Sequence, residues 1–135
     1  MFEHFVTAQN LVWPAVVAEL SAGQKRTHWM WFVFPQLAAL GRSERALRYG
    51  LAGLDAAAAY LQHPVLGARL REVTRLVLAV EGRSAHETFG SPDDMKFRSS
   101  MTLFAHAAPG EALWREALAR YFGGVEDGLT VGLLA

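Results

Sequence analysis

Cysteine is absent from this chain. Without it there is no disulfide bond, zinc–thiolate site, iron–sulfur cluster or thiol nucleophile. An excess of charge of one sign is also absent, because 13 basic and 13 acidic side chains give a formal net charge of zero. Proteins that coat nucleic acid are usually strongly basic. The composition therefore argues against thiol chemistry and against nucleic acid as a partner.

Long hydrophobic runs are missing as well. No uncharged run is longer than residues 27–41, which contain Pro35 and Gln36 and fall short of the roughly 20 mostly apolar residues that a membrane span needs. The N-terminus carries Glu3 where a secretory signal has basic residues followed by an apolar stretch. We therefore expect a cytoplasmic protein with no membrane-spanning segment.

Apolar residues, in contrast, are plentiful: 52% of the 135 residues are hydrophobic and only 19% are charged. That length and composition suit one domain whose core needs no disulfide or metal, and the low charge argues against disorder. No stretch combines strand alternation with hairpin turns. We therefore expect an all-α protein, a single compact multihelical domain of six to seven helices over residues 1–135.

Apolar spacing and capping signals place the expected helices. Steps of three and four through residues 2–20 predict an amphipathic helix, which Pro14 either kinks or divides in two. Ser43 and Ser84 are good N-caps, and Ser91 is expected to cap a helix that has Pro92 at its first position. The expected helices cover residues 2–20, 44–53, 55–61, 64–82, 84–90, 91–106 and 111–122, and residues 127–134 are a candidate for a final helical turn.

One block, residues 23–36, gathers aromatic and basic side chains. Trp29 and Trp31 are two residues apart, so they cannot share one helix face, and each indole N–H needs an acceptor if buried. Two interpretations stay open. The block is either a core plug with basic flanks, or a pocket wall that stacks on a planar ligand oriented by Lys25, His28 and Gln36. Its backbone is either a short buried helix or an extended segment.

A second block begins at Asp93. Lys96, Ser99 and Ser100 share one helical face by their spacing of three and four. The serines either bond back to the preceding turn and allow close helix packing, or one of them is a nucleophile beside the lysine. Asp93 and Asp94 would repel a phosphate at this helix N-terminus unless Lys25, Arg26 or Lys96 offset their charge.

The histidines do not have the spacing of a metal site on a helix. They occupy positions 4, 28, 63, 86 and 106, and no two are three or four residues apart. His63 precedes a proline and is expected to have a capping or surface role. We therefore expect no metal site, and no cofactor motif is present.

These blocks resemble a family of small bacterial proteins known as domain of unknown function 1810, some of which carry a calpastatin-like label. The matching motifs lie at residues 8–9, 19–20, 23–36, 40–49, 60–70, 89–104 and 124–127. Thr27 stands where the family pattern has serine, and Ala38-Ala39 replaces a more polar pair. The resemblance implies a compact all-helical domain, and it carries no activity, cofactor or catalytic residue with it.

The residues support a small-ligand pocket as the first hypothesis, with a nucleotide-like or glycosidic ligand. Whether the protein is an enzyme stays open; if it is, we expect a hydrolase in which Asp93 or Glu19 activates water. The candidate catalytic residues are His28, Asp93, Lys96 and Ser100. The candidate ligand-binding residues are Lys25, His28, Trp29, Trp31, Gln36, Lys96, Ser99 and Ser100.

Two alternatives use other surfaces. The first is a non-catalytic protein-interaction module in which the tryptophan-rich block forms a partner-binding patch. The second is nucleic-acid binding through a helix that carries Arg69, Arg71 and Arg75, against which Glu72 and the neutral total charge both count. The sequence leaves the oligomeric state open.

Overall fold

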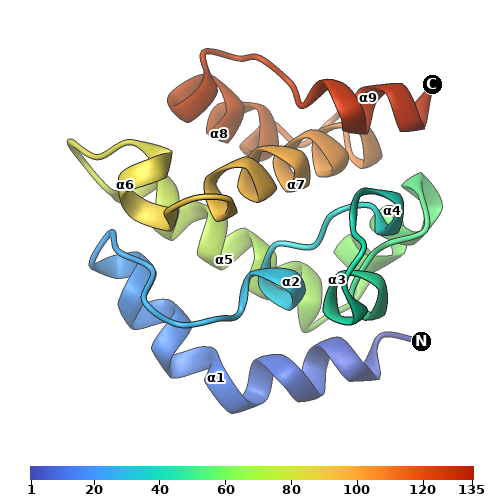
Figure 1. Cartoon of the computed structure of the whole chain (residues 1–135), viewed down its shortest axis with the longest axis horizontal. Helices are drawn as coiled ribbons and strands as arrows, with labels where there is room; N and C mark the ends of the chain where they lie inside the picture. Colours follow the sequence, from blue (N-terminus) through green and yellow to red (C-terminus); the bar gives the residue numbers. More distant parts are fainter.

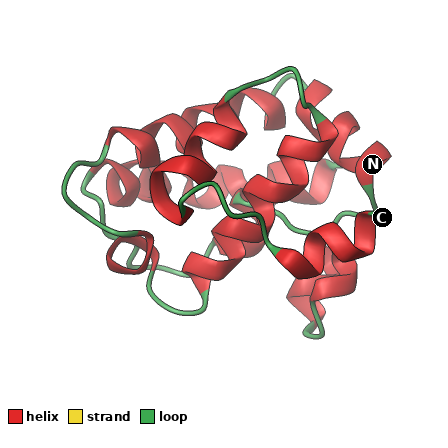
Figure 2. Ribbon diagram, turned by 90° about the horizontal axis from the view of Figure 1, so that it is seen from above, coloured by secondary structure: helices red, strands yellow, loops and turns green.

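Helices and connecting loops make up the whole chain, which a computed structural model describes over residues 1–135 without a strand (Figures 1 and 2). The elements are α1 (Glu3–Ser21), α2 (Met30–Val33), the 3₁₀ turn η1 (Ala38–Leu40), α3 (Glu44–Arg48), α4 (Leu54–Gln62), α5 (Leu66–Ala79), α6 (Ala85–Phe89), α7 (Asp93–Ala107), α8 (Leu113–Phe122) and α9 (Gly128–Leu134). Nine of these are α-helices, and six of the nine have seven or more residues. The all-α single domain is confirmed.

The helices pack in layers around α5 and α7. In Figure 1, α1 lies along one side of the molecule and α8 and α9 along the other, with α5 and α7 between them. Phe97, Met101 and Phe104 of α7 are fully buried. Tyr60 of α4 and Trp114 of α8 pack against Phe104, at ring-centroid distances of 5.7 and 5.6 Å. The helix that follows Asp93 is thus the centre of the core.

Helix α1 runs through Pro14 without a break, so the division into two helices is wrong. Proline removes the hydrogen bond to the carbonyl of the residue four positions earlier, here Asn10. Both Pro14 and Asn10 are exposed. Water can therefore satisfy the freed carbonyl, and the helix continues.

Local capping predictions mostly hold. The Ser43 hydroxyl accepts the N–H of Ala46 at 3.1 Å, and Ser84 forms a capping box with Glu87. His63 also caps, because its Nδ1 accepts the N–H groups of Val65 and Leu66, each at 3.2 Å. These contacts join residues two or three positions apart, which is why the sequence predicts them.

Several boundaries differ from expectation by two residues or more, as in α5 and α8, and two of the differences have a visible cause. Helix α3 ends at Arg48 and not near Gly53, because Leu51 forms backbone hydrogen bonds with Gln36 and Ala38 at 2.9 and 2.8 Å. Ser91 does not cap α7, because Pro92 occupies the N-cap and the carbonyl of Gly90 accepts the N–H of Asp94 at 2.9 Å. In both places a backbone carbonyl outside the predicted helix accepts an N–H group that was expected to bond within the helix or with its cap.

The block at residues 27–40 combines both expected conformations. A single turn of helix, α2, is followed by an extended segment and then by the 3₁₀ turn η1. The extended part bears Leu37, which pairs in parallel with Leu51 in an isolated β-bridge. This segment carries Gln36 toward α3 and so brings the aromatic block next to that helix.

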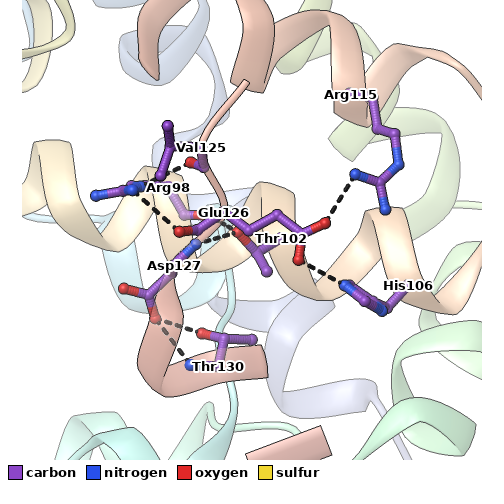
Figure 3. Close-up of polar contacts among 8 residues, drawn as sticks. All are labelled: Arg98, Thr102, His106, Arg115, Val125, Glu126, Asp127 and Thr130. Atoms are coloured by element: carbon purple, nitrogen blue, oxygen red, sulfur yellow. Dashed lines mark hydrogen bonds and ion pairs between the residues drawn. The ribbon is translucent and has the colours of Figure 1, made fainter. Parts of the chain in front are cut away.

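The segment before α9 is tied down by polar contacts (Figure 3). Glu126 binds Arg115 of α8 and His106 of α7, each at 2.8 Å, and Arg98 donates to the carbonyl of Glu126 at 3.0 Å. Asp127 caps α9 by accepting the N–H of Thr130 at 3.0 Å. The final helical turn is therefore confirmed. None of the helices combines the length and the apolar character that crossing a membrane requires.

Candidate functional site

The two unusual blocks of the sequence meet at Asp93. Its carboxylate lies 2.9 Å from the ammonium group of Lys25 and 3.8 Å from that of Lys96. The Lys25 side chain is only 6% exposed, so this pair is shielded from solvent and from salt. Each lysine also lies over a tryptophan ring, Lys25 at 4.9 Å from Trp29 and Lys96 at 5.1 Å from Trp31. Two cations, two indoles and one carboxylate therefore form one cluster.

Local structure explains this meeting. Asp93 and Lys96 are three residues apart in the first turn of α7, so they lie on the same side of the helix. The backbone N–H of Lys25 donates to the carbonyl of Thr88 at 2.7 Å, which holds the loop after α1 against α6. Because α6 leads directly into α7, this single contact places Lys25 beside Asp93.

Trp29 belongs to the core. It is fully buried, and its indole N–H donates to Glu19 at 3.0 Å. Glu19 also accepts the backbone N–H groups of Arg26 and Thr27. Partial burial acts to raise the pKa of Glu19, but these hydrogen bonds outweigh it and the pKa lies below its ordinary value. A carboxylate with this many donors holds the loop together and is not free to act as a base.

Trp31 faces outward, in agreement with the prediction that the two tryptophans occupy different faces. It is half-buried, and both Lys96 and the guanidinium of Arg45 lie 5.1 Å from its ring centroid. Trp31, Gln36 and Lys96 line a small pocket together with Tyr49 of the segment after α3. Its volume of about 10 Å³ holds roughly one water molecule. A larger planar ligand would therefore have to lie on the outer face of Trp31.

Three of the predicted site residues lie elsewhere. His28 is exposed and lines a separate cleft between α1 and α3. Ser99 is buried and its hydroxyl donates to the carbonyl of Met95 at 3.1 Å, the helix back-bond expected of a packing serine. Ser100 is 0% exposed, and its hydroxyl has no hydrogen-bond partner in the structure. The binding and catalytic roles of Ser99 and Ser100 stay predictions that this geometry does not favour, and His28 lies outside the cluster around Asp93.

Arg45 is the contributor that the sequence did not reveal. It sits one helical turn before Tyr49 and 14 residues after Trp31, and no motif connects it with the aromatic block. Two of the three arginines expected on a nucleic-acid-binding helix are engaged within the protein. Arg71 holds Glu111 through two hydrogen bonds of 2.7 and 3.0 Å, and Arg69 donates to Gln9 and Asn10.

Comparison with known proteins agrees with the family resemblance. The crystal structure of the conserved hypothetical protein Rv1873 from Mycobacterium tuberculosis is similar, with a TM-score of 0.96 and 57% sequence identity. The match covers 98% of this chain and 94% of that chain. No curated protein matches the chain. The family described as "Protein of unknown function (DUF1810)" matches residues 1–134. The chain therefore belongs to this family.

Proposed function

We propose that this protein binds a small nucleotide-like ligand on the outer face of Trp31, in the cytoplasm of a bacterial cell. The observation that carries the proposal is the arrangement of Lys96 and Arg45, each 5.1 Å from the Trp31 ring centroid. The Trp31 side chain is half-buried, so part of its indole is open to solvent and can stack on a planar base without regard to the identity of that base. Cations held at the same ring bind the negative charge of a phosphate.

The neighbouring groups give the site a positive balance. Lys25 and Lys96 share the single carboxylate of Asp93, so this trio keeps one net positive charge, and Arg45 adds a second. Arg45 has no ion pair within the chain, so an anion can approach it without displacing a carboxylate. Gln36, beside Trp31, offers an amide donor and acceptor for the edge of a base.

Binding is better supported than hydrolysis. Asp93 would have to activate water, but its two oxygens face the ammonium groups of Lys25 and Lys96. Both oxygens are thus taken up by contacts with cations, which leaves neither one placed to accept a proton from a water molecule. The interaction-module alternative loses one of its two tryptophans, because Trp29 is fully buried.

The change in melting temperature on addition of a ligand tests the proposal. Nucleoside monophosphates should raise the melting temperature more than the matching nucleosides or ribose 5-phosphate do, since both the base and the phosphate contribute. A ligand at 100 times its Kd adds about 2.7 kcal/mol of stability. The Trp31→Ala variant should lose the shift, and Lys96→Gln should bind the nucleotide no better than the nucleoside.

The chain offers a matched control for Trp31. Trp13 is also half-buried, and Arg69 lies 5.0 Å from its ring centroid. Trp13→Ala should therefore bind nucleotides as the wild-type protein does. If no nucleotide shifts the melting temperature, or if Trp31→Ala and Trp13→Ala behave alike, the proposal is wrong.

A further inference from the structure

We infer that a second binding site, distinct from the Trp31 face, lies in the cleft between α1 and α3 and takes a small organic anion, an apolar body that carries a carboxylate or phosphate group. The cleft has a volume of about 310 Å³, at the lower end of the range of small-molecule sites. In Figure 1 this region lies where α2 and α3 approach α1.

One wall of the cleft is apolar. Leu11 and Val12 of α1 and Phe32 of α2 line it. The Leu11 side chain is 81% exposed, so a large apolar group stands uncovered beside the cleft. This wall suits a small aromatic or branched aliphatic body.

The opposite wall is basic. Arg45 and Arg48 line it from α3, and His28 lines it from the loop before α2. Residues 45 and 48 are three positions apart, so their side chains leave the helix on the same side. None of the residues that line the cleft carries a carboxylate. The charge of this wall therefore calls for a negatively charged group on the ligand.

The arginines of this wall are unlike most others in the chain. Seven arginine side chains donate hydrogen bonds within the protein, and these are Arg26, Arg69, Arg71, Arg83, Arg98, Arg115 and Arg120. The other four are Arg42, Arg45, Arg48 and Arg75. Three of those four lie in α3 or just before it, so the unused guanidinium donors of the protein are concentrated at one place.

Aromatic rings hold the two guanidinium groups in position. Arg45 lies over Trp31 at 5.1 Å, and Arg48 lies over Tyr49 at 5.7 Å. A guanidinium stacked on a ring keeps its in-plane N–H donors free, and two such donors match the two oxygens of a carboxylate or phosphate. His4 of α1 supports this wall by stacking on Tyr49 and by contacting the carbonyl of Arg48 at 3.1 Å.

Phenyl phosphate and benzoate are suitable probes, and amide chemical-shift titration is a suitable measurement. Both probes should shift resonances of residues 8–12, 28–32 and 45–49. Inorganic phosphate and benzyl alcohol each supply half of the ligand, so both should bind at least tenfold more weakly than phenyl phosphate. Comparison of the two anionic probes then tells whether the basic wall prefers a phosphate or a carboxylate.

Variants separate this site from the Trp31 face. Arg48→Gln and Leu11→Ser change only exposed cleft residues, and each should weaken phenyl phosphate binding, the first at least tenfold. Arg75→Gln, which removes an unpaired arginine of α5, and Lys96→Gln, which alters the nucleotide site, should leave the affinity unchanged. The inference is overturned if neither anion binds at millimolar concentration, if Arg48→Gln binds as the wild-type protein does, or if the shifts map to Lys96 instead.

Discussion

Glu19 accepts the indole N–H of Trp29 at 3.0 Å and so connects the last turn of α1 with the side chain that fills the core ten residues later. The same carboxylate accepts the backbone N–H groups of Arg26 and Thr27 at 2.7 and 3.0 Å. The loop between these contacts carries Lys25, which reaches Asp93. One acidic side chain thus positions Lys25 and Trp29, which residues 23–36 contribute to the candidate site.

Replacement of Glu19 by alanine should lower the free energy of unfolding by about 2–4 kcal/mol, because a buried indole N–H and two backbone donors would lose a charged acceptor. Glu19→Gln should cost less, since Oε1 accepts all three N–H groups and an amide oxygen can replace it, while the amide NH₂ can donate to the Thr27 hydroxyl. Urea denaturation measures both. Glu116→Gln, on the exposed side of α8, is the control and should unfold as the wild-type protein does. Equal stability of all three variants would contradict the role of Glu19.

The two neighbouring tryptophans should respond very differently to truncation. Trp29 is fully buried, so Trp29→Ala should cost about 3–5 kcal/mol of stability. Trp31 is half-buried and contacts Lys96 and Arg45, so Trp31→Ala should cost no more than about 1–2 kcal/mol. The measurement is the midpoint of denaturant unfolding with a common slope. A cost for Trp31→Ala as large as that for Trp29→Ala would show that Trp31 is a core residue.

Gly67 should not tolerate a side chain. A Cβ atom there would lie 2.1 Å from the carbonyl oxygen of Leu61, and backbone cannot move aside as a flexible side chain can. Gly67→Ala should therefore lower the stability by about 2–4 kcal/mol even though alanine favours helices. Gly128→Ala, in the first turn of α9 with no atom near the added Cβ, should be neutral or stabilising by about 0.5–1 kcal/mol. Thermal unfolding of the two variants is the measurement, and equal changes in their melting temperatures would contradict the prediction.

Stability should fall with acid partly through Glu126. Hydrogen bonds with His106 and Arg115 hold the pKa of this carboxyl below its ordinary value (Figure 3). A depressed folded-state pKa contributes stability that is fully present above the ordinary glutamate pKa of about 4.3 and is lost as the pH falls through the folded-state pKa. Glu126→Gln should therefore be less stable than wild type at neutral pH, and the difference should shrink below about pH 4.

Urea unfolding at a series of pH values from neutral to acidic measures that difference. Glu116→Gln again serves as the control, because Glu116 has no ion pair or side-chain hydrogen bond, and its difference from wild type should not vary with pH. A gap between Glu126→Gln and wild type that stays constant through the acid range would show that the carboxylate contributes no pH-dependent stability.

Those features of the fold that depend on nearby residues could be predicted. The caps at Ser43 and Ser84 rest on contacts across three positions, and α5 rests on regular apolar spacing. The end of α3 could not be predicted, because Leu51 leaves the helix to bond with Gln36 and Ala38 far earlier in the chain. Long-range backbone pairing of this kind leaves no local signal in the sequence.

The candidate site could be predicted in residue type but not in arrangement. The spacing of Trp29 and Trp31 correctly placed them on different faces. Lys25 reaches the carboxylate that Lys96 also contacts because the loop after α1 docks on α6. This contact joins residues more than 60 positions apart, so the sequence does not predict it. Arg45 could not be predicted, because nothing in the sequence of α3 distinguishes it from the neighbouring exposed arginines.

Arg45 stands at the boundary of the two proposed sites, over Trp31 on one side and along the α1–α3 cleft on the other. A single guanidinium cannot give its full set of donors to both ligands at once. If both sites bind, each ligand therefore changes the affinity of the other by the same factor, as thermodynamic linkage requires. The occupancy of each site would then depend on the concentrations of both ligands, because both draw on the donors of Arg45.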